Sequence, residues 1–305
     1  MTALLDVRDV SKRFTLGGVF GRKTVHAVDG ASLTLQTETP EIFTIIGESG
    51  SGKTTLARMI LGLEDPTEGS ILFQGQTVRR RMGKDERMRF MSSVQPVFQN
   101  PFEAFNPLRQ IDRYLDSTAR AFLGATDKTV IDAAMDDALQ KVGLSLAEIR
   151  GRFPHELSGG QLQRVAIARA LIPKPALLIA DEPVSMVDAS LRMSIVNLLK
   201  TLRDSFGVSV IYITHDLATA YYISDRIMIM QRGRIVEIGA ARKVLETPEH
   251  PYSRLLKSSV LSTADAGAGQ LAVDPTLLRA ASDCIGRPGR LVSRPDGRAV
   301  MIHDA

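Results

Sequence analysis

Alternating apolar and polar positions predict strands in the N-terminal part of the chain. Residues 4–10 (LLDVRDV) and 25–35 (VHAVDGASLTL) alternate in this way, and Asp29-Gly30 inside the second segment is a hairpin signal. Residues 71–78 (ILFQGQTV) predict a further strand pair. We therefore expect antiparallel strands in this part of the chain.

Continuous apolar runs and helical spacing dominate the rest of the chain. Apolar runs that are typical of fully buried strands occur at 42–46 (IFTII), 176–180 (ALLIA) and 208–213 (VSVIYI). Apolar residues at three- and four-residue spacing predict helices within 54–63, 111–150 and 189–205. The helix at 189–205 joins two of the buried strands, and a strand–helix–strand crossover predicts a parallel sheet.

The C-terminal part has weaker patterns. Residues 227–239 (IMIMQRGRIVEIG) predict a hairpin, and the small, polar stretch 262–272 (STADAGAGQLA) predicts a linker. The tail at 273–305 has balanced charge and weak periodicity. It is either a docking extension or a disordered tail.

Amino-acid composition excludes several classes of protein and of site. The 305 residues are 44% hydrophobic and 24% charged, an ordinary globular composition, and the net charge of +4 does not call for nucleic acid. Cys284 is the one cysteine, so a disulfide framework and a four-cysteine metal site within the chain are excluded. No apolar run approaches the roughly 20 residues that span a bilayer, and the N-terminal residues do not resemble a signal peptide.

A glycine-rich loop predicts a nucleotide site. The sequence 47-GESGSGKT-54 fits G-x-x-x-x-G-K-[ST], follows an apolar run and opens a predicted helix. Glycines allow backbone N–H groups to face phosphate oxygens, the helix N-terminus adds partial positive charge, and the hydroxyl of Thr54 suits Mg²⁺. The predicted nucleotide contacts of this loop are Gly47, Ser49, Gly50, Ser51, Gly52, Lys53, Thr54 and Thr55.

Two adjacent carboxylates end the apolar run of 177-LLIADEPVSMVD-188. Side chains alternate along a strand, so Asp181 and Glu182 are expected to take different roles. We expect Asp181 to hold Mg²⁺ and Glu182 to orient and polarise the attacking water, because phosphoryl transfer to water depends on positioning and charge stabilisation.

A second glycine turn opens the helix in 157-LSGGQLQRVAIARAL-171. Ser158 and Gln161 have the S-x-x-Q spacing of a capping box, so one interpretation is a well-capped helix. Gly159 and Gly160 weaken a helix start by roughly 1 kcal/mol each but leave backbone N–H groups open to a phosphate. We expect this turn to serve the ATP of another subunit.

These motifs together resemble the ATP-binding cassette (ABC) ATPases over roughly residues 4–260. The resemblance implies an α/β fold, with a P-loop NTPase core around a mainly parallel sheet, an antiparallel β subdomain and a helical signature subdomain. It implies an ATP-binding domain at 1–261, with the helical subdomain at roughly 100–172, followed by a linker and C-terminal extension at 262–305.

The resemblance also implies a role for each matching residue. The glycine loop resembles Walker A, LLIADEP resembles Walker B, and LSGGQ resembles the family signature, whose Ser158 and Gly160 contact the γ-phosphate on the opposite subunit. The remaining matches are Gln99 with the Q-loop, Asp188 with the D-loop, His215 with the switch histidine, and Phe14 with the aromatic that stacks on adenine. Glu182, His215 and Gln99 are the expected catalytic residues, and Thr54, Gln99 and Asp181 are the expected Mg²⁺ ligands.

A finer resemblance concerns the transported solute. FQNPFEAFNP and 248-PEHPYSRLL-256 resemble the ATPases of oligopeptide, dipeptide, opine and nickel importers, whose relatives also import oligosaccharides. This implies ATP and Mg²⁺ as ligands, a peripheral location on the cytoplasmic face of the inner membrane, a second ATPase chain, two transmembrane permease subunits and an extracytoplasmic solute-binding protein. A heterodimer of ATPases is favoured, with a homodimer as the alternative. Many relatives ligate an iron–sulfur cluster, but one thiolate cannot hold one, so none is expected.

Two other functions remain as alternatives. One is a soluble ABC ATPase that acts on nucleic acid or ribosomes, and the other is an exporter motor. Acids interrupt the basic run 79-RRRMGKDERMR-89, which favours a solvated face, and no nucleic-acid partner is expected.

Overall fold

The computed structural model describes residues 2–17, 23–100, 104–185, 187–264 and 274–303. Contacts divide the chain into two compact units. The first unit comprises Met1–Arg80 and Ile213–Ala305, and the second comprises Arg81–Tyr212. Among the described residues, no helix is long and apolar enough to cross a membrane.

The first unit contains the expected antiparallel strands. The order in this sheet is β2-β1-β4-β5, and the bounds are β1 (Ala3–Leu16), β2 (Lys23–Gln36), β4 (Glu68–Phe73) and β5 (Gln76–Thr77). The strand pair predicted at 71–78 is confirmed, since β4 pairs with β5 in antiparallel register.

The hairpin predicted at Asp29-Gly30 is wrong, because β2 continues through both residues. Pairing of β1 with β2 steps from Val10↔Ala31 to Lys12↔Val28, so β2 advances by one residue more than β1. Gly30 supplies the left-handed backbone for this bulge, with φ +65°. A bulge and a hairpin turn both need positive φ, and the sequence signal did not distinguish them.

In the second sheet, the strands that lie wholly in the first unit follow the order β11-β12-β10-β9-β3. The buried strand β3 (Ile42–Ile46) pairs in parallel with β9 (Arg226–Gln231). The hairpin predicted at 227–239 is confirmed as β9 and β10 (Arg234–Ala240). Beyond β10, the strands β12 (Ala299–His303) and β11 (Gly289–Ser293) extend the sheet.

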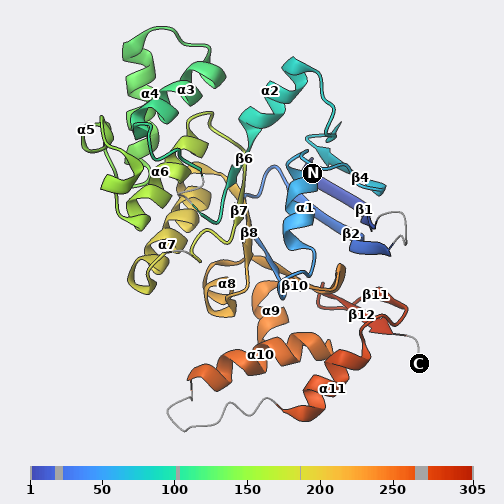
Figure 1. Cartoon of the computed structure of the whole chain (residues 1–305). Helices are drawn as coiled ribbons and strands as arrows, with labels where there is room; N and C mark the ends of the chain where they lie inside the picture. Colours follow the sequence, from blue (N-terminus) through green and yellow to red (C-terminus); the bar gives the residue numbers. More distant parts are fainter. Residues whose placement is uncertain (1, 18–22, 101–103, 186, 265–273, 304–305) are drawn as a thin grey trace. The chain divides into compact units, whose positions relative to one another are not determined.

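The helices of the first unit are α1 (Lys53–Ile60), α8 (Leu217–Ile223), α9 (Ala241–Glu246), α10 (Pro251–Ala264) and α11 (Pro275–Asp283). The C-terminal extension is part of this unit's core, since Ala281 and Met301 pack in one apolar cluster with Ile229. Helices α10 and α11 lie side by side (Figure 1). The predicted linker at 262–272 begins inside α10, and its residues 265–272 lie outside the described residues.

The second unit combines parallel strands with helices. Strand β6 (Val94–Val97) pairs in parallel with β7 (Leu177–Asp181), and β8 (Ser209–Thr214) is the neighbour of β7 that carries the chain into the first unit. The helices are α2 (Lys84–Ser93), α3 (Ile111–Leu123), α4 (Lys128–Gln140), α5 (Leu146–Ile149), α6 (Gly159–Leu171) and α7 (Ala189–Phe206). The helices and crossover predicted for this region are thus present.

Candidate functional site

The glycine loop connects β3 to α1. At two of its positions, close packing leaves no room for a side chain and so requires glycine. A Cβ atom on Gly47 would lie 2.2 Å from the carbonyl oxygen of Met230, and one on Gly52 would lie 2.2 Å from that of Ala27. Gly50 differs, because a Cβ atom there would meet nothing within 4 Å. Gly47 and Gly52 therefore let the loop pack closely on its own unit, whereas Gly50 leaves the opposite face of the loop open.

Two hydrogen bonds from other segments hold the loop. The backbone N–H of Gly233 donates to Ser51 O (2.9 Å), and the backbone N–H of Glu48 donates to the Tyr252 hydroxyl (3.0 Å). Burial raises the pKa of Tyr252 to about 12, so the acceptor stays a neutral hydroxyl. Sequence reasoning missed this role of Tyr252, because no local pattern pairs a residue of α10 with the glycine loop.

The surroundings of the Lys53 side chain favour the binding of an anion. Its side chain is only 6% exposed, and Nζ donates to Gly47 O (2.7 Å) and Glu48 O (2.9 Å). Helix α1 begins after Gly52, which provides no side-chain cap, and its first turn has no acidic residue. The buried Ser51 Oγ has no hydrogen-bond partner among the described residues. A phosphate would match the buried ammonium and the uncapped helix start, so these residues fit the expected nucleotide.

The other predicted loop contacts differ in exposure. Ser49 and Gly50 are exposed on the loop, and Thr54 is exposed in the first turn of α1. The side chain of Thr55 is half-buried. Thr54 therefore presents a hydroxyl oxygen, the type of ligand that Mg²⁺ prefers.

His215 and Phe14 also belong to the first unit. His215 is exposed in the turn after β8, where the backbone N–H of Asp216 donates to Thr214 Oγ1 (3.0 Å) and fixes the turn. Phe14 is 36% exposed, and Lys12 Nζ lies 5.1 Å from its ring centroid. Phe14 is therefore not a core residue, and its ring is available for stacking, as an adenine contact requires.

The predicted catalytic carboxylate lies in the second unit. Glu182 follows β7 in a left-handed backbone conformation with φ +47°, which is costly for a residue with a Cβ atom. Gln99 Nε2 donates to Glu182 Oε2 (3.2 Å), and Ser185 Oγ donates to Glu182 O (3.0 Å). Asp181 is the half-buried last residue of β7. The structure thus brings together Gln99 and Glu182, two residues that the sequence predicted for one reaction.

The signature turn has the expected capping box. Ser158 Oγ accepts from the backbone N–H of Gln161 (3.2 Å), and Gln161 Oε1 accepts from that of Ser158 (3.1 Å). The two glycines have different neighbours. A Cβ atom on Gly159 would meet nothing within 4 Å, whereas one on the buried Gly160 would lie 2.8 Å from Leu191 Cδ1. Gly159 leaves the helix start open, and Gly160 allows α6 to pack on α7.

Asp188, the predicted D-loop residue, is connected to this turn through Leu191. It is exposed at the start of α7 without a side-chain cap bond, and its carbonyl accepts from the backbone N–H of Leu191 (2.9 Å). Because Leu191 also lies next to Gly160, the signature turn packs against the start of α7 within the second unit.

The predicted residues divide between the two units. The first unit holds Phe14, the glycine loop and His215, and the second holds Gln99, Asp181, Glu182, the signature turn and Asp188. The first unit therefore carries the glycine loop, and the second carries the carboxylate pair and the signature turn.

Comparison with known proteins places these features in a family. The family model described as ABC transporter matches residues 29–185. The oligopeptide transport ATP-binding protein AppF of Bacillus subtilis (strain 168) is 38% identical over 268 residues, covering 87% of this chain and 80% of AppF. The corresponding protein OppF of Escherichia coli (strain K12) is 41% identical over 238 residues, covering 78% of this chain and 70% of OppF.

Solved structures agree in fold. The dimeric post-hydrolysis structure of the ATP-binding cassette MJ0796 with ADP and Pi has a TM-score of 0.68 at 27% identity, covering 78% of this chain and 99% of that one. The structure of cbiO1 from Clostridium perfringens, part of the ABC transporter complex cbiONQ, has a TM-score of 0.67 at 26% identity, covering 84% of this chain and 96% of that one. These matches confirm the α/β P-loop ATPase fold and the ATPase activity that the motifs predicted. The chain therefore belongs to the ABC transporter family.

Proposed function

We propose that this chain is the ATP-binding and ATP-hydrolysing subunit of an importer of oligopeptides or similar small solutes. The observation that carries the proposal is the match with oligopeptide transport ATP-binding proteins over most of both chains, 41% identical for OppF of Escherichia coli. An intact glycine loop, carboxylate pair and signature turn support the same conclusion, because a chain with these groups is equipped for hydrolysis.

The first unit supplies the groups that bind the triphosphate. Lys53 already donates to two loop carbonyls, Gly47 O and Glu48 O, and its buried charge is better compensated by phosphate oxygens than by neutral dipoles. Mg²⁺ would neutralise charge on the phosphates, and Thr54 and Asp181 offer the oxygen ligands that it prefers. Phe14 stacks on the adenine and His215 contacts the γ-phosphate.

Glu182 is the proposed general base for the attacking water. Gln99 occupies one of its carboxylate oxygens through the hydrogen bond of 3.2 Å. A carboxylate that accepts a hydrogen bond is a weaker base, so withdrawal of Gln99 activates Glu182. We further propose that Gln99, which matches the Q-loop, senses the membrane partner, so that this hydrogen bond couples transport to hydrolysis.

The signature turn contributes to a site on a second cassette. Ser158 is exposed and Gly159 leaves the helix start open, so both are available to a phosphate carried by another chain. The proposed assembly contains a second, different ATPase chain, two permease subunits and an extracytoplasmic solute-binding protein, at the cytoplasmic face of the membrane. Residues 1–261 form its ATP-binding domain, and 262–305 form an extension.

Uptake by the reconstituted complex tests the proposal. The chain is co-expressed with its permease and solute-binding partners, reconstituted into vesicles and supplied with labelled peptides and oligosaccharides of graded length. We expect ATP-dependent uptake of at least one peptide class, abolished in Glu182→Gln. Uptake of oligosaccharides alone would exclude peptides as the solute. Outward movement of solute, or co-purification with nucleic acid or ribosomes instead of membrane subunits, would contradict the proposal.

A further inference from the structure

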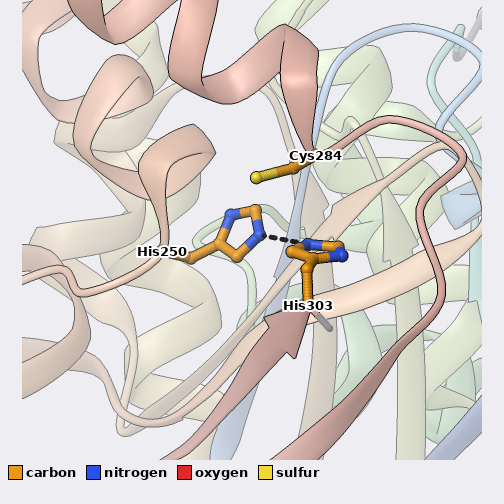
Figure 2. Close-up of side chains that lie close together, drawn as sticks. All are labelled: His250, Cys284 and His303. Atoms are coloured by element: carbon orange, nitrogen blue, oxygen red, sulfur yellow. Dashed lines mark hydrogen bonds between the residues drawn. The ribbon is translucent and has the colours of Figure 1, made fainter. Parts of the chain in front are cut away.

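Three potential metal ligands lie together in the first unit, separate from the nucleotide-binding residues. His250 precedes α10, Cys284 follows α11 and His303 ends β12, and Figure 2 shows the three side chains pointing toward one another. Their candidate ligand atoms all lie within 4.8 Å of one another, and His250 Nε2 is 3.3 Å from His303 Nε2. Tertiary folding alone brings these residues together, because they are far apart in the sequence.

The separations are close to those of a tetrahedral metal site. Zinc–nitrogen bonds of about 2.0–2.1 Å at tetrahedral angles place two ligand nitrogens about 3.3 Å apart. The two imidazole nitrogens, 3.3 Å apart, already have this spacing. A zinc–sulfur bond of about 2.3 Å requires a sulfur–nitrogen separation of about 3.6 Å. Since the ligand atoms lie within 4.8 Å of one another, the Cys284 sulfur needs to approach by no more than about 1.2 Å. A change of side-chain rotamer at the end of α11 supplies such a movement.

The donor set selects the type of metal. Two imidazoles and one thiol suit zinc and other borderline or soft cations, whereas Mg²⁺ and Ca²⁺ prefer oxygen ligands. Burial and the neighbouring His303 lower the pKa of His250 to about 4, so its ring is neutral near pH 7. Burial raises the pKa of the Cys284 thiol, and a bound metal takes the thiolate while the thiol proton passes to solvent.

Neighbouring residues hold His250 in place, and a cavity gives a metal ion access to the cluster. The backbone N–H of His250 donates to Glu237 Oε2 (3.2 Å), and the buried Glu237 is itself paired with Arg298 from the C-terminal extension (3.5 Å). A cavity of about 470 Å³ is lined by both Cys284 and His303, so a metal ion can reach them and water can occupy a fourth coordination position.

Metal binding has one local cost. His250 Nδ1 accepts from the backbone N–H of Tyr252 (3.2 Å), which places the ring proton on Nε2 in the metal-free form. Coordination through Nε2 moves this proton to Nδ1 and gives up that hydrogen bond. A hydrogen bond between the two rings is the competing explanation for the separation of 3.3 Å.

We propose that His250, Cys284 and His303 bind one Zn²⁺ ion, which fastens the C-terminal extension to the segment that begins α10. Water completes the coordination. The three ligands are not among the residues proposed for ATP hydrolysis, and the site does not rest on the proposed transport function.

Cobalt substitution provides a direct test, because the chain has a single cysteine. The purified, nucleotide-free full chain is stripped with a chelator and titrated with Co²⁺ and then Zn²⁺. We expect a thiolate-to-cobalt charge-transfer band that saturates at one ion per chain and disappears when Zn²⁺ displaces Co²⁺. Any such band must come from Cys284. Zn²⁺ should also protect Cys284 from a thiol-modifying reagent.

Matched variants separate the metal site from the hydrogen-bonded pair. Cys284→Ser and His303→Gln should lower Zn²⁺ affinity at least about tenfold, since even supporting residues of metal sites have effects of that size. His26→Gln is the control, because His26 lines the same cavity but lies outside the cluster. Wild-type chain without a thiolate band or Zn²⁺ protection of Cys284 would overturn the proposal, and so would binding of Cu(I) without Zn²⁺. The wild-type measurements decide the question even if a variant fails to fold.

Discussion

The two adjacent glycines of the signature turn should respond differently to the same substitution. Gly159→Ala adds a methyl group where nothing lies within 4 Å, and Gly160→Ala adds one 2.8 Å from Leu191 Cδ1. Both substitutions gain roughly 0.5–1 kcal/mol from the lower backbone entropy of alanine. At Gly160 the added methyl group displaces Leu191 Cδ1, the end of a flexible side chain, and an off-rotamer position of Leu191 costs about 0.5–1.5 kcal/mol.

The free energy of unfolding should therefore be about 0.5–1.5 kcal/mol higher for Gly159→Ala than for Gly160→Ala. Both glycines lie in the second unit, and its unfolding can be followed by urea titration of the full chain. The two variants should have equal dependence of the free energy of unfolding on urea before their unfolding midpoints are compared. Activity should follow a different order. In the assembled complex, Gly159→Ala should keep its fold but lose ATPase activity, because the added methyl group covers a helix start that faces the partner's nucleotide.

Two results would refute this reasoning. If Gly160→Ala unfolds at the same urea concentration as Gly159→Ala, or at a higher one, Gly160 is not required by the packing of α6 on α7. If Gly159→Ala retains full ATPase activity, the open helix start does not contact a phosphate.

The remaining predictions concern catalysis, the partner's site and the C-terminal extension. Glu182→Gln should keep ATP binding and lower turnover by about 10²–10⁴-fold, the usual contribution of a general base, and single-turnover hydrolysis near the wild-type rate would exclude that role. Ser158→Ala in this chain alone should impair hydrolysis at the site built on the partner's glycine loop, measured in a mixed assembly; loss at the site on this chain's own loop would contradict it. Arg298→Ala should destabilise the first unit by about 3–5 kcal/mol, because it leaves the buried carboxylate of Glu237 without its ion pair. Exposed Arg290→Ala is the control for this thermal-unfolding measurement, and equal melting temperatures would show that the Arg298 ion pair contributes little.

Local sequence patterns were sufficient for most of the strands and helices. The run at 42–46 coincides with β3, and the glycine loop, the carboxylate pair and the capping box lie on the predicted elements. These features depend on short-range physics, namely apolar periodicity, helix capping and the positive φ of glycine, which a few neighbouring residues determine. The hairpin at Asp29-Gly30 failed for the same reason, because positive φ is compatible with a turn and with a bulge.

Only the tertiary structure separated residues that look alike in the sequence. Gly159 and Gly160 are adjacent and identical, but α7 packs against one and leaves the other open. Tyr252 reaches the glycine loop, and His250 reaches Cys284 and His303, through contacts between segments far apart in the sequence. The amino-acid sequence by itself determined the family and the nucleotide chemistry, because their motifs are contiguous. Long-range packing decided which glycine is structural and which distant side chains meet, because no local preference encodes the distance between two elements.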